Sequence, residues 1–118
     1  MRVQLTRDSV AMGDDVAAPH AVTRDVPDDT SVRSLLDGIL SAGYLATVAG
    51  GRATWIATAG DATPLAVLAQ QWAAPRLFPA GRTPLTTHAG PDGTLRLHFG
   101  YRAQLDPEAE YARLGGCR

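Results

Sequence analysis

One amphipathic segment, PDDTSVRSLLDGILSAGY at residues 27–44, constrains the fold of this chain more than any other. Thr30 or Ser31 can serve as its N-cap and Gly43 as its stop, which predicts a helix over about residues 30–42. A helix with a single apolar face is stable only when that face is covered, so the rest of the chain must supply a sheet for it. The apolar residues recur at the spacing of one helix face: Val32, Leu35, Leu36, Ile39 and Leu40.

The flanking segments alternate between apolar and polar residues, as strands do. The first 27 residues predict a hairpin with Val22 and Val26 facing inward, and residues 53–58 and 64–72 predict two further strands, although 64–72 also fits a short helix. LTTHA at 85–89 and TLRLHFGYRAQL at 94–105 predict a second hairpin around the turn at Asp92 and Gly93. The segment DPEAEYARLGG at 106–116 predicts a short closing helix capped by Asp106.

These elements predict an α+β fold in one domain over residues 1–118, since a chain of this length is enough for one core. The single cysteine, Cys117, excludes an internal disulfide, and the absence of lysine excludes Schiff-base chemistry and a phosphate-loop lysine. A basic set made only of arginine indicates the coding bias of a high-GC bacterium. The sequence has no signal peptide and no apolar run that could span a bilayer, which predicts a cytoplasmic protein.

The stretch DVPDDTSVRSLLDGIL resembles the junction between the second strand and the helix of ubiquitin-like proteins. The shared features, over about residues 20–45, are an apolar residue before Pro27, a polar turn with a Thr cap, and a Leu/Ile stripe. The resemblance implies a β-grasp-like mixed sheet packed on one main helix, to which this chain adds a C-terminal hairpin and a short helix. It also implies a non-catalytic module that binds other proteins.

The C-terminal segment ARLGGCR is similar to the Gly-Gly tails of ubiquitin-like modifiers. Mapped onto this chain, Gly115 and Gly116 would be the conjugating pair after a protease removes the last two residues. The alternative is that the two glycines end the closing helix.

Two groups of residues are candidate binding sites. Asp14, Asp15 and His20 could gather at the mouth of the first hairpin, either as a polar loop recognised by a partner or as the ligands of a metal-assisted hydrolase. A basic stripe on the open face of the C-terminal hairpin, suited to phosphate or an acidic partner surface, would comprise His88, Arg96, His98 and Arg102. Trp55 and Trp72 are each either core residues or interface anchors.

The partner of this protein is expected to be another protein. A net charge of −1 and a polar strand face without interleaved aromatic residues argue against nucleic acid. The sequence has no nucleophile motif of the G-x-S-x-G type, and neither a cofactor nor a resident metal is expected. Self-association of the chain stays open.

Overall fold

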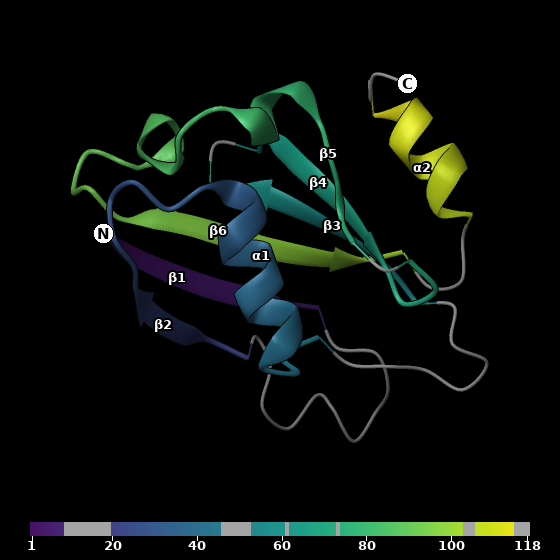
Figure 1. Ribbon diagram of the computed structural model, residues 1–118, viewed down its shortest axis with the longest axis horizontal. Coiled ribbons are helices and arrows are strands. Elements are labelled where there is room, and N and C mark those ends of the chain that lie inside the picture. Colours follow the sequence, from purple (N-terminus) through teal and green to yellow (C-terminus); the bar gives the residue numbers. More distant parts are fainter. Residues whose placement is uncertain (9–19, 46–52, 61, 73, 103–105, 115–118) are drawn as a thin grey trace.

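The computed structural model describes residues 1–8, 20–45, 53–60, 62–72, 74–102 and 106–114. Its strands form one mixed sheet, and its two α-helices lie apart from each other (Figure 1). In chain order the elements are β1 (Arg2–Arg7), β2 (Val22–Asp25), α1 (Val32–Ser41), β3 (Thr54–Ala59), β4 (Pro64–Ala69), β5 (Arg76–Leu77), the 3₁₀-helices η2 (Pro79–Arg82) and η3 (Leu85–His88), β6 (Leu95–Tyr101) and α2 (Pro107–Arg113).

The described strands form a six-stranded sheet in the order β2-β1-β6-β3-β4-β5. β1 and β6 are parallel neighbours, with Val3 opposite Leu95 and Arg7 opposite Phe99, whereas the other pairs are antiparallel. The N-terminal hairpin is therefore confirmed as the pair β1–β2. The α+β class, with a mixed sheet packed on one main helix, is confirmed as well.

Helix α1 begins and ends where its local signals predict. The Ser31 side chain accepts a hydrogen bond from the Ser34 amide at 3.1 Å, so Ser31 and not Thr30 is the N-cap. At the other end, Gly43 takes a φ of +70°, and the amides of Gly43 and Tyr44 donate to the carbonyls of Leu40 and Ile39. This pair of hydrogen bonds is the Schellman motif, which requires a residue that tolerates positive φ at the position of Gly43.

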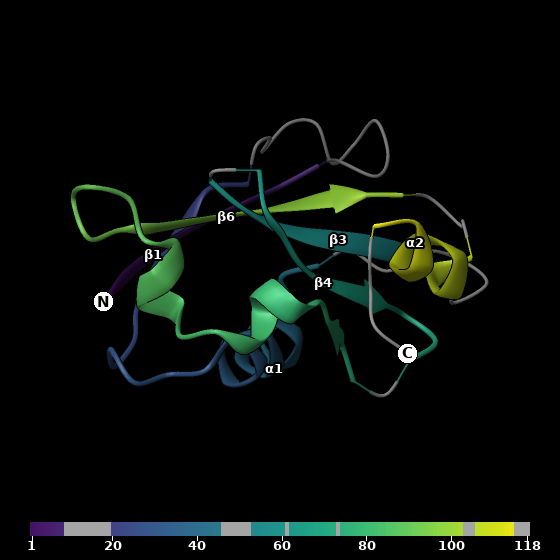
Figure 2. The ribbon, with the colours of Figure 1, turned by 90° about the horizontal axis from the view of Figure 1, so that it is seen from above.

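The main core lies between α1 and one face of the sheet, and Figure 2 shows the helix lying along that side. Val32, Leu35, Leu36 and Ile39 are buried against it, but Leu40 is 41 % exposed. The predicted apolar face of the helix, the core ridge, is therefore confirmed except for Leu40. The strands supply the facing side chains, among them Val3, Leu5, Trp55, Ala57, Leu65, Leu68, Leu95, Leu97 and Phe99.

A smaller core lies on the opposite face, over the β3–β4–β5 part of the sheet. Ile56 and Val67 alternate with the residues of the main core and meet Phe78 and Tyr111, whose rings stack with centroids 4.9 Å apart. The Tyr111 hydroxyl also donates to the Leu77 carbonyl at 2.8 Å. α2 covers this area, and elsewhere on the same face Arg96 and His98 of β6 face outward.

The predicted C-terminal hairpin is wrong. Residues 85–88 form the 3₁₀-helix η3, and the turn at Gly90–Gly93 leads from it into β6. The reason is topological, because β6 already bonds to β1 on one edge and to β3 on the other. No edge of β6 is left for a partner strand from residues 85–89.

The remaining strand predictions are confirmed with one exception. Pro64–Ala69 is a strand and not a helix, and Val26 packs against the main core. Val22 lies opposite Leu5 and so on the core side of β2, but it is 41 % exposed. Because β2 is the edge strand of the described sheet, Val22 has a neighbouring strand on one side only.

We expect Leu36→Ala to lower the free energy of unfolding by about 2–5 kcal/mol, since it would leave a cavity under α1. Leu36 is fully buried, whereas Leu40 is 41 % exposed, so Leu40→Ala on the same helix is the matched control and should cost less than about 1 kcal/mol. Urea denaturation monitored by circular dichroism measures both changes. Equal losses for the two variants would contradict this account of the helix.

Two glycine substitutions should change stability in opposite directions. A Cβ at Gly81 in η2 would overlap the Leu65 carbonyl, so Gly81→Ala should cost about 1–3 kcal/mol or more. A Cβ at Gly38 in α1 would meet only the Arg24 side chain, at 3.7 Å, so Gly38→Ala should stabilise the helix by about 0.5–1 kcal/mol. Thermal unfolding of the two variants compares them, and a stable Gly81→Ala protein would show that η2 does not pack on β4 as described.

Candidate functional site

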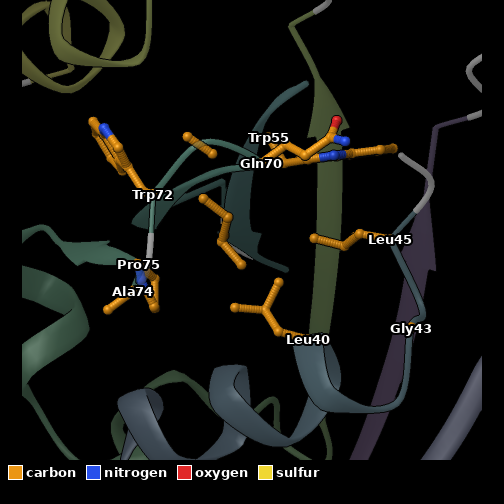
Figure 3. A pocket seen from close by; sticks show the side chains of 10 residues that line it. Leu40, Gly43, Leu45, Trp55, Gln70, Trp72, Ala74 and Pro75 are labelled. Carbon is orange, nitrogen blue, oxygen red and sulfur yellow. The ribbon is translucent and has the colours of Figure 1, made fainter. Parts of the chain in front are cut away.

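An apolar pocket of about 300 Å³ opens between the C-terminal end of α1 and the ends of β3 and β4. Figure 3 shows Leu40, Leu45, Trp55 and Trp72 arranged around it. It is lined by Leu40, Gly43, Leu45, Trp55, Leu68, Ala69, Gln70, Trp72, Ala74 and Pro75.

The pocket exists because α1 is shorter than the surface it covers. A helix of 10 residues is about 15 Å long, and α1 ends at Ser41 beside the turn at Gly43. Beyond that point the helix no longer covers Trp55, near the start of β3, and Leu68, near the end of β4. Both residues line the pocket there. Leu40, which the periodicity assigns to the core ridge, instead forms part of the pocket wall.

Trp55 forms a buried wall of the pocket and is 2 % exposed, so its assignment as a core residue is confirmed. The Tyr101 ring packs against it with centroids 4.9 Å apart. Behind it, the guanidinium of the buried Arg7 lies 6.0 Å from the Trp55 ring and 5.8 Å from the Tyr44 ring. Burial raises the pKa of the Tyr44 hydroxyl, and the positive charge of Arg7 offsets part of that rise.

Trp72 is half-buried and forms the wall nearest to β5. Its amide donates to the Ala69 carbonyl at 3.0 Å, in the turn that follows β4. The guanidinium of Arg76 lies over the Trp72 ring, 4.4 Å from its centroid. Glu108 on α2 binds both terminal nitrogens of Arg76 at 2.7 Å. Trp72 is therefore held through Arg76 and Glu108, which connects the pocket wall to α2.

The described side chains that line this pocket are mostly apolar. Among the described residues that line it, none carries a carboxylate, an imidazole, a thiol or a hydroxyl. Its side-chain polar groups are the Gln70 amide and the two indoles, and Gln70 Oε1 already accepts the Ala53 amide at 3.3 Å. The described lining can thus hold an apolar group and offers no general acid, base or nucleophile of its own.

The predicted basic stripe is only partly assembled. Arg96 and His98 do lie on one face of β6, but carboxylates accompany each basic residue. Arg96 binds Asp92 at 2.9 Å, and Arg102 lies 3.9 Å from Glu110. Glu110 in turn binds Arg113 at 2.7 Å. These neighbours offset most of the positive charge, so the stripe is a weaker anion site than the sequence suggests.

His98 forms hydrogen bonds to Thr6 in β1 and to Asp8, the residue that follows β1. Its Nε2 lies 2.9 Å from a carboxylate oxygen of Asp8, and its Nδ1 lies 2.8 Å from the Thr6 hydroxyl. The second Asp8 oxygen accepts the Tyr101 amide at 2.9 Å. The resulting chain of hydroxyl, imidazole and carboxylate uses both ring nitrogens to connect β1 to β6. Its contacts are those of a clamp between these two strands.

His88 does not belong to the stripe. It lies on η3, where its Nε2 is 2.9 Å from the Ala80 carbonyl and 2.8 Å from the Thr83 hydroxyl. These bonds connect η3 to η2. The expectation that His88 lies on a strand beside β6 is wrong, because β1 and β3 occupy both edges of β6.

The other predicted site residues are described only in part. Asp14, Asp15, Gly115 and Gly116 lie outside the described residues, so the hairpin-loop site and the Gly-Gly tail stay predictions. His20 is described, with a φ of 59°, and its carbonyl accepts the Tyr44 hydroxyl. Within the described part of the chain, no group of three or more His, Cys, Asp or Glu residues could hold a metal ion.

Sequence reasoning found the two tryptophans but not the pocket between them. One signal for the pocket was present in the sequence. Leu40 is the last apolar residue of the helix and Leu45 follows the stop at Gly43, so two apolar side chains lie where the helix ends. The distance from there to Trp72 depends on how β4 lies beside β3, which the sequence pattern does not specify.

Comparison of the chain with protein-family models, with curated proteins and with solved structures found no match. None of the helices in the described segments has the length and apolar character needed to cross a membrane.

The stability of the turn before β6 should depend on pH. Hydrogen bonds from the Arg96 guanidinium and the Thr94 amide lower the pKa of Asp92 to about 2. Because this pKa lies below the usual value of about 4, the carboxylate stabilises the fold above pH 4, and this contribution is lost as the pH falls toward 2.

We therefore expect Asp92→Asn to be less stable than the wild type at neutral pH, with a difference that shrinks as the pH falls from about 4 to about 2. Urea midpoints measured across this range test the expectation. Asp37→Asn, at an exposed aspartate of α1, is the control for removing one carboxylate far from this turn. A difference between Asp92→Asn and wild type that stays constant down to pH 2 would contradict the assignment.

Proposed function

We propose that this chain is a non-catalytic protein-interaction module of ubiquitin-like type, which binds an apolar side chain of a partner protein in the pocket between α1 and β4. The proposal rests on one observation. Two tryptophans, three leucines and a proline surround a pocket whose wall includes Leu40, 41 % exposed. Concave apolar sites with aromatic walls are typical of the pockets that receive an anchor residue at protein interfaces.

The size and chemistry of the pocket support a protein partner over a cofactor. Its volume of about 300 Å³ lies at the small end of the range for small-molecule sites, about 300–1,000 Å³. A site of this size fits one or two apolar side chains. Its lack of acids, bases and nucleophiles among the described lining residues favours binding without catalysis.

The architecture supports the same proposal. The β-grasp-like sheet with one main helix agrees with the resemblance to ubiquitin-like proteins at the junction of residues 25–40. Part of the pocket wall comes from the sheet, since Trp55 on β3 and Leu68 on β4 are both buried in the main core. A pre-formed site of this kind reduces the ordering that binding would require.

The test uses the two exposed large apolar residues of the described chain, Leu40 and Val22, which are each 41 % exposed. Leu40 lines the pocket, whereas Val22 lies on β2 and does not. Partners captured by the tagged wild-type protein are identified, purified and titrated against Leu40→Asp and Val22→Asp. We expect Leu40→Asp to weaken Kd at least about tenfold and Val22→Asp to change it less than about twofold.

Thermal unfolding of both variants shows whether they remain folded at the temperature of the titration. Trp72→Ala is a second pocket variant and should weaken the same partner. Equal binding by Leu40→Asp and wild type, with the protein folded, would refute the pocket as the binding site. A loss confined to Val22→Asp would move the interface to the edge strand β2.

A further inference from the structure

A second hollow adjoins the apolar pocket at the β5 edge of the sheet, where α1 and α2 approach it from opposite faces. It has a volume of about 410 Å³. Pro75 lines both hollows, and Arg76 of the second stacks on Trp72 of the first. The two sites therefore form one continuous surface. The second hollow is lined by Arg33, Pro75, Arg76, Leu77, Arg82, Glu108 and Tyr111.

This second hollow has an excess of positive charge. Three arginines line it against the single carboxylate of Glu108, and that carboxylate is bound to Arg76. Arg33 and Arg82 are both exposed, and neither forms an ion pair or hydrogen bond within the described chain. Asp37 follows Arg33 by one turn on α1 but does not pair with it. Two guanidinium groups are thus available to a ligand.

Both of these arginines, Arg33 and Arg82, project from ordered elements. Arg33 is the second residue of α1, near the positive end of the helix dipole, which adds to its attraction for an anion. Arg82 is the last residue of η2, whose preceding Gly81 packs directly against the β4 backbone at Leu65. Guanidinium groups bind carboxylates through paired, charge-assisted hydrogen bonds.

We propose that the two adjoining hollows bind a single acidic segment of a partner protein. A bulky apolar side chain of the segment enters the pocket lined by Leu40, Trp55 and Trp72, and nearby Asp or Glu carboxylates bind Arg33 and Arg82. The inference rests on the proposed function, because it uses the same apolar pocket, and it adds the chemistry of the partner.

Charge complementarity favours an acidic protein segment over a nucleic acid. A polyanion is normally bound by many cations along its length, but this chain has a net charge of −1, and the hollow has two guanidinium groups that are unpaired among the described residues. An apolar pocket beside two cations instead matches one apolar side chain beside a pair of carboxylates. Such mixed sites, with an aromatic anchor and a charged rim, are common where proteins recognise short segments.

The experiment uses the full chain and synthetic peptides of about twelve residues, read out by tryptophan fluorescence, to which Trp72 contributes. Each peptide carries one Phe and one Glu-Glu pair, separated by about one to six residues. Matched peptides replace Glu-Glu by Gln-Gln or Phe by Gly. We expect the Phe and Glu-Glu peptides of at least one spacing to bind, with an affinity that falls as salt rises, because exposed ion pairs are screened.

Arginine variants assign the binding to the hollow. Arg33→Gln and Arg82→Gln should each weaken the best peptide by about five- to tenfold, and Arg2→Gln, at an exposed arginine of β1, should leave its Kd within about twofold. Arg2 shares the face of β1 that carries Gln4 and Thr6, away from α1, which makes it a matched control. All three arginines are exposed, so the variants should fold, and circular dichroism verifies this.

The outcomes separate this inference from the proposed function. Equal binding of the Gln-Gln and Glu-Glu peptides would overturn the acidic segment but leave the apolar pocket in place. Equal binding of the Gly and Phe peptides would refute the apolar pocket and with it the proposed function. Tighter binding of a single-stranded oligonucleotide than of any peptide would overturn the protein segment. A failure of all peptides at low salt would overturn the inference, and the Leu40→Asp titration would then decide the proposed function alone.

Discussion

The parallel pairing of β1 with β6 is the interaction on which the rest of this structure depends. It brings residues 3–7 against residues 95–99 and places β6 between the N-terminal hairpin and the β3–β4 pair. Asp8 extends the pairing by accepting the Tyr101 amide, and His98 joins Asp8 to Thr6 across the two strands. Parallel pairs cannot be made by a tight turn, so this contact needs the whole intervening chain to cross the sheet. Without it, the sheet under α1 would divide into two halves.

The two faces of the sheet are covered unequally, and this arrangement produces the candidate sites. α1 covers the main core but ends near the start of β3 and the end of β4, which leaves the apolar pocket beyond Leu40. α2 covers the other face over β3 to β5 and fixes Arg76 through Glu108. The arginine-lined hollow lies at the β5 edge, where Arg33 of α1 and Glu108 of α2 both line it. The exposed apolar and cationic groups on this edge are therefore next to one another.

Local signals predicted the parts of the fold that local bonds determine. The N-cap at Ser31, the stop at Gly43 and the cap at Asp106 each involve residues within a few positions of one another, and the structure contains all three. Predictions that needed a partner from elsewhere were less accurate. Residues 85–89 have strand character, but both edges of β6 are taken by β1 and β3, so they form η3. His88 followed that segment and bonds to η2 instead of joining the basic stripe.

The amino-acid sequence alone determined the position and ends of α1, the apolar ridge it presents and the alternation of β6, because these depend on side-chain spacing and on bonds along the chain. The tertiary structure decided which strands are neighbours and therefore which exposed residues meet. Leu40, Trp72 and Arg76 come from different elements, and Arg33 and Arg82 are separated by most of the sheet in chain order. Their proximity follows from the packing of α1, β4, β5 and η2 against one another, since contacts over such separations are selected by the packing of the complete core and not by any short segment.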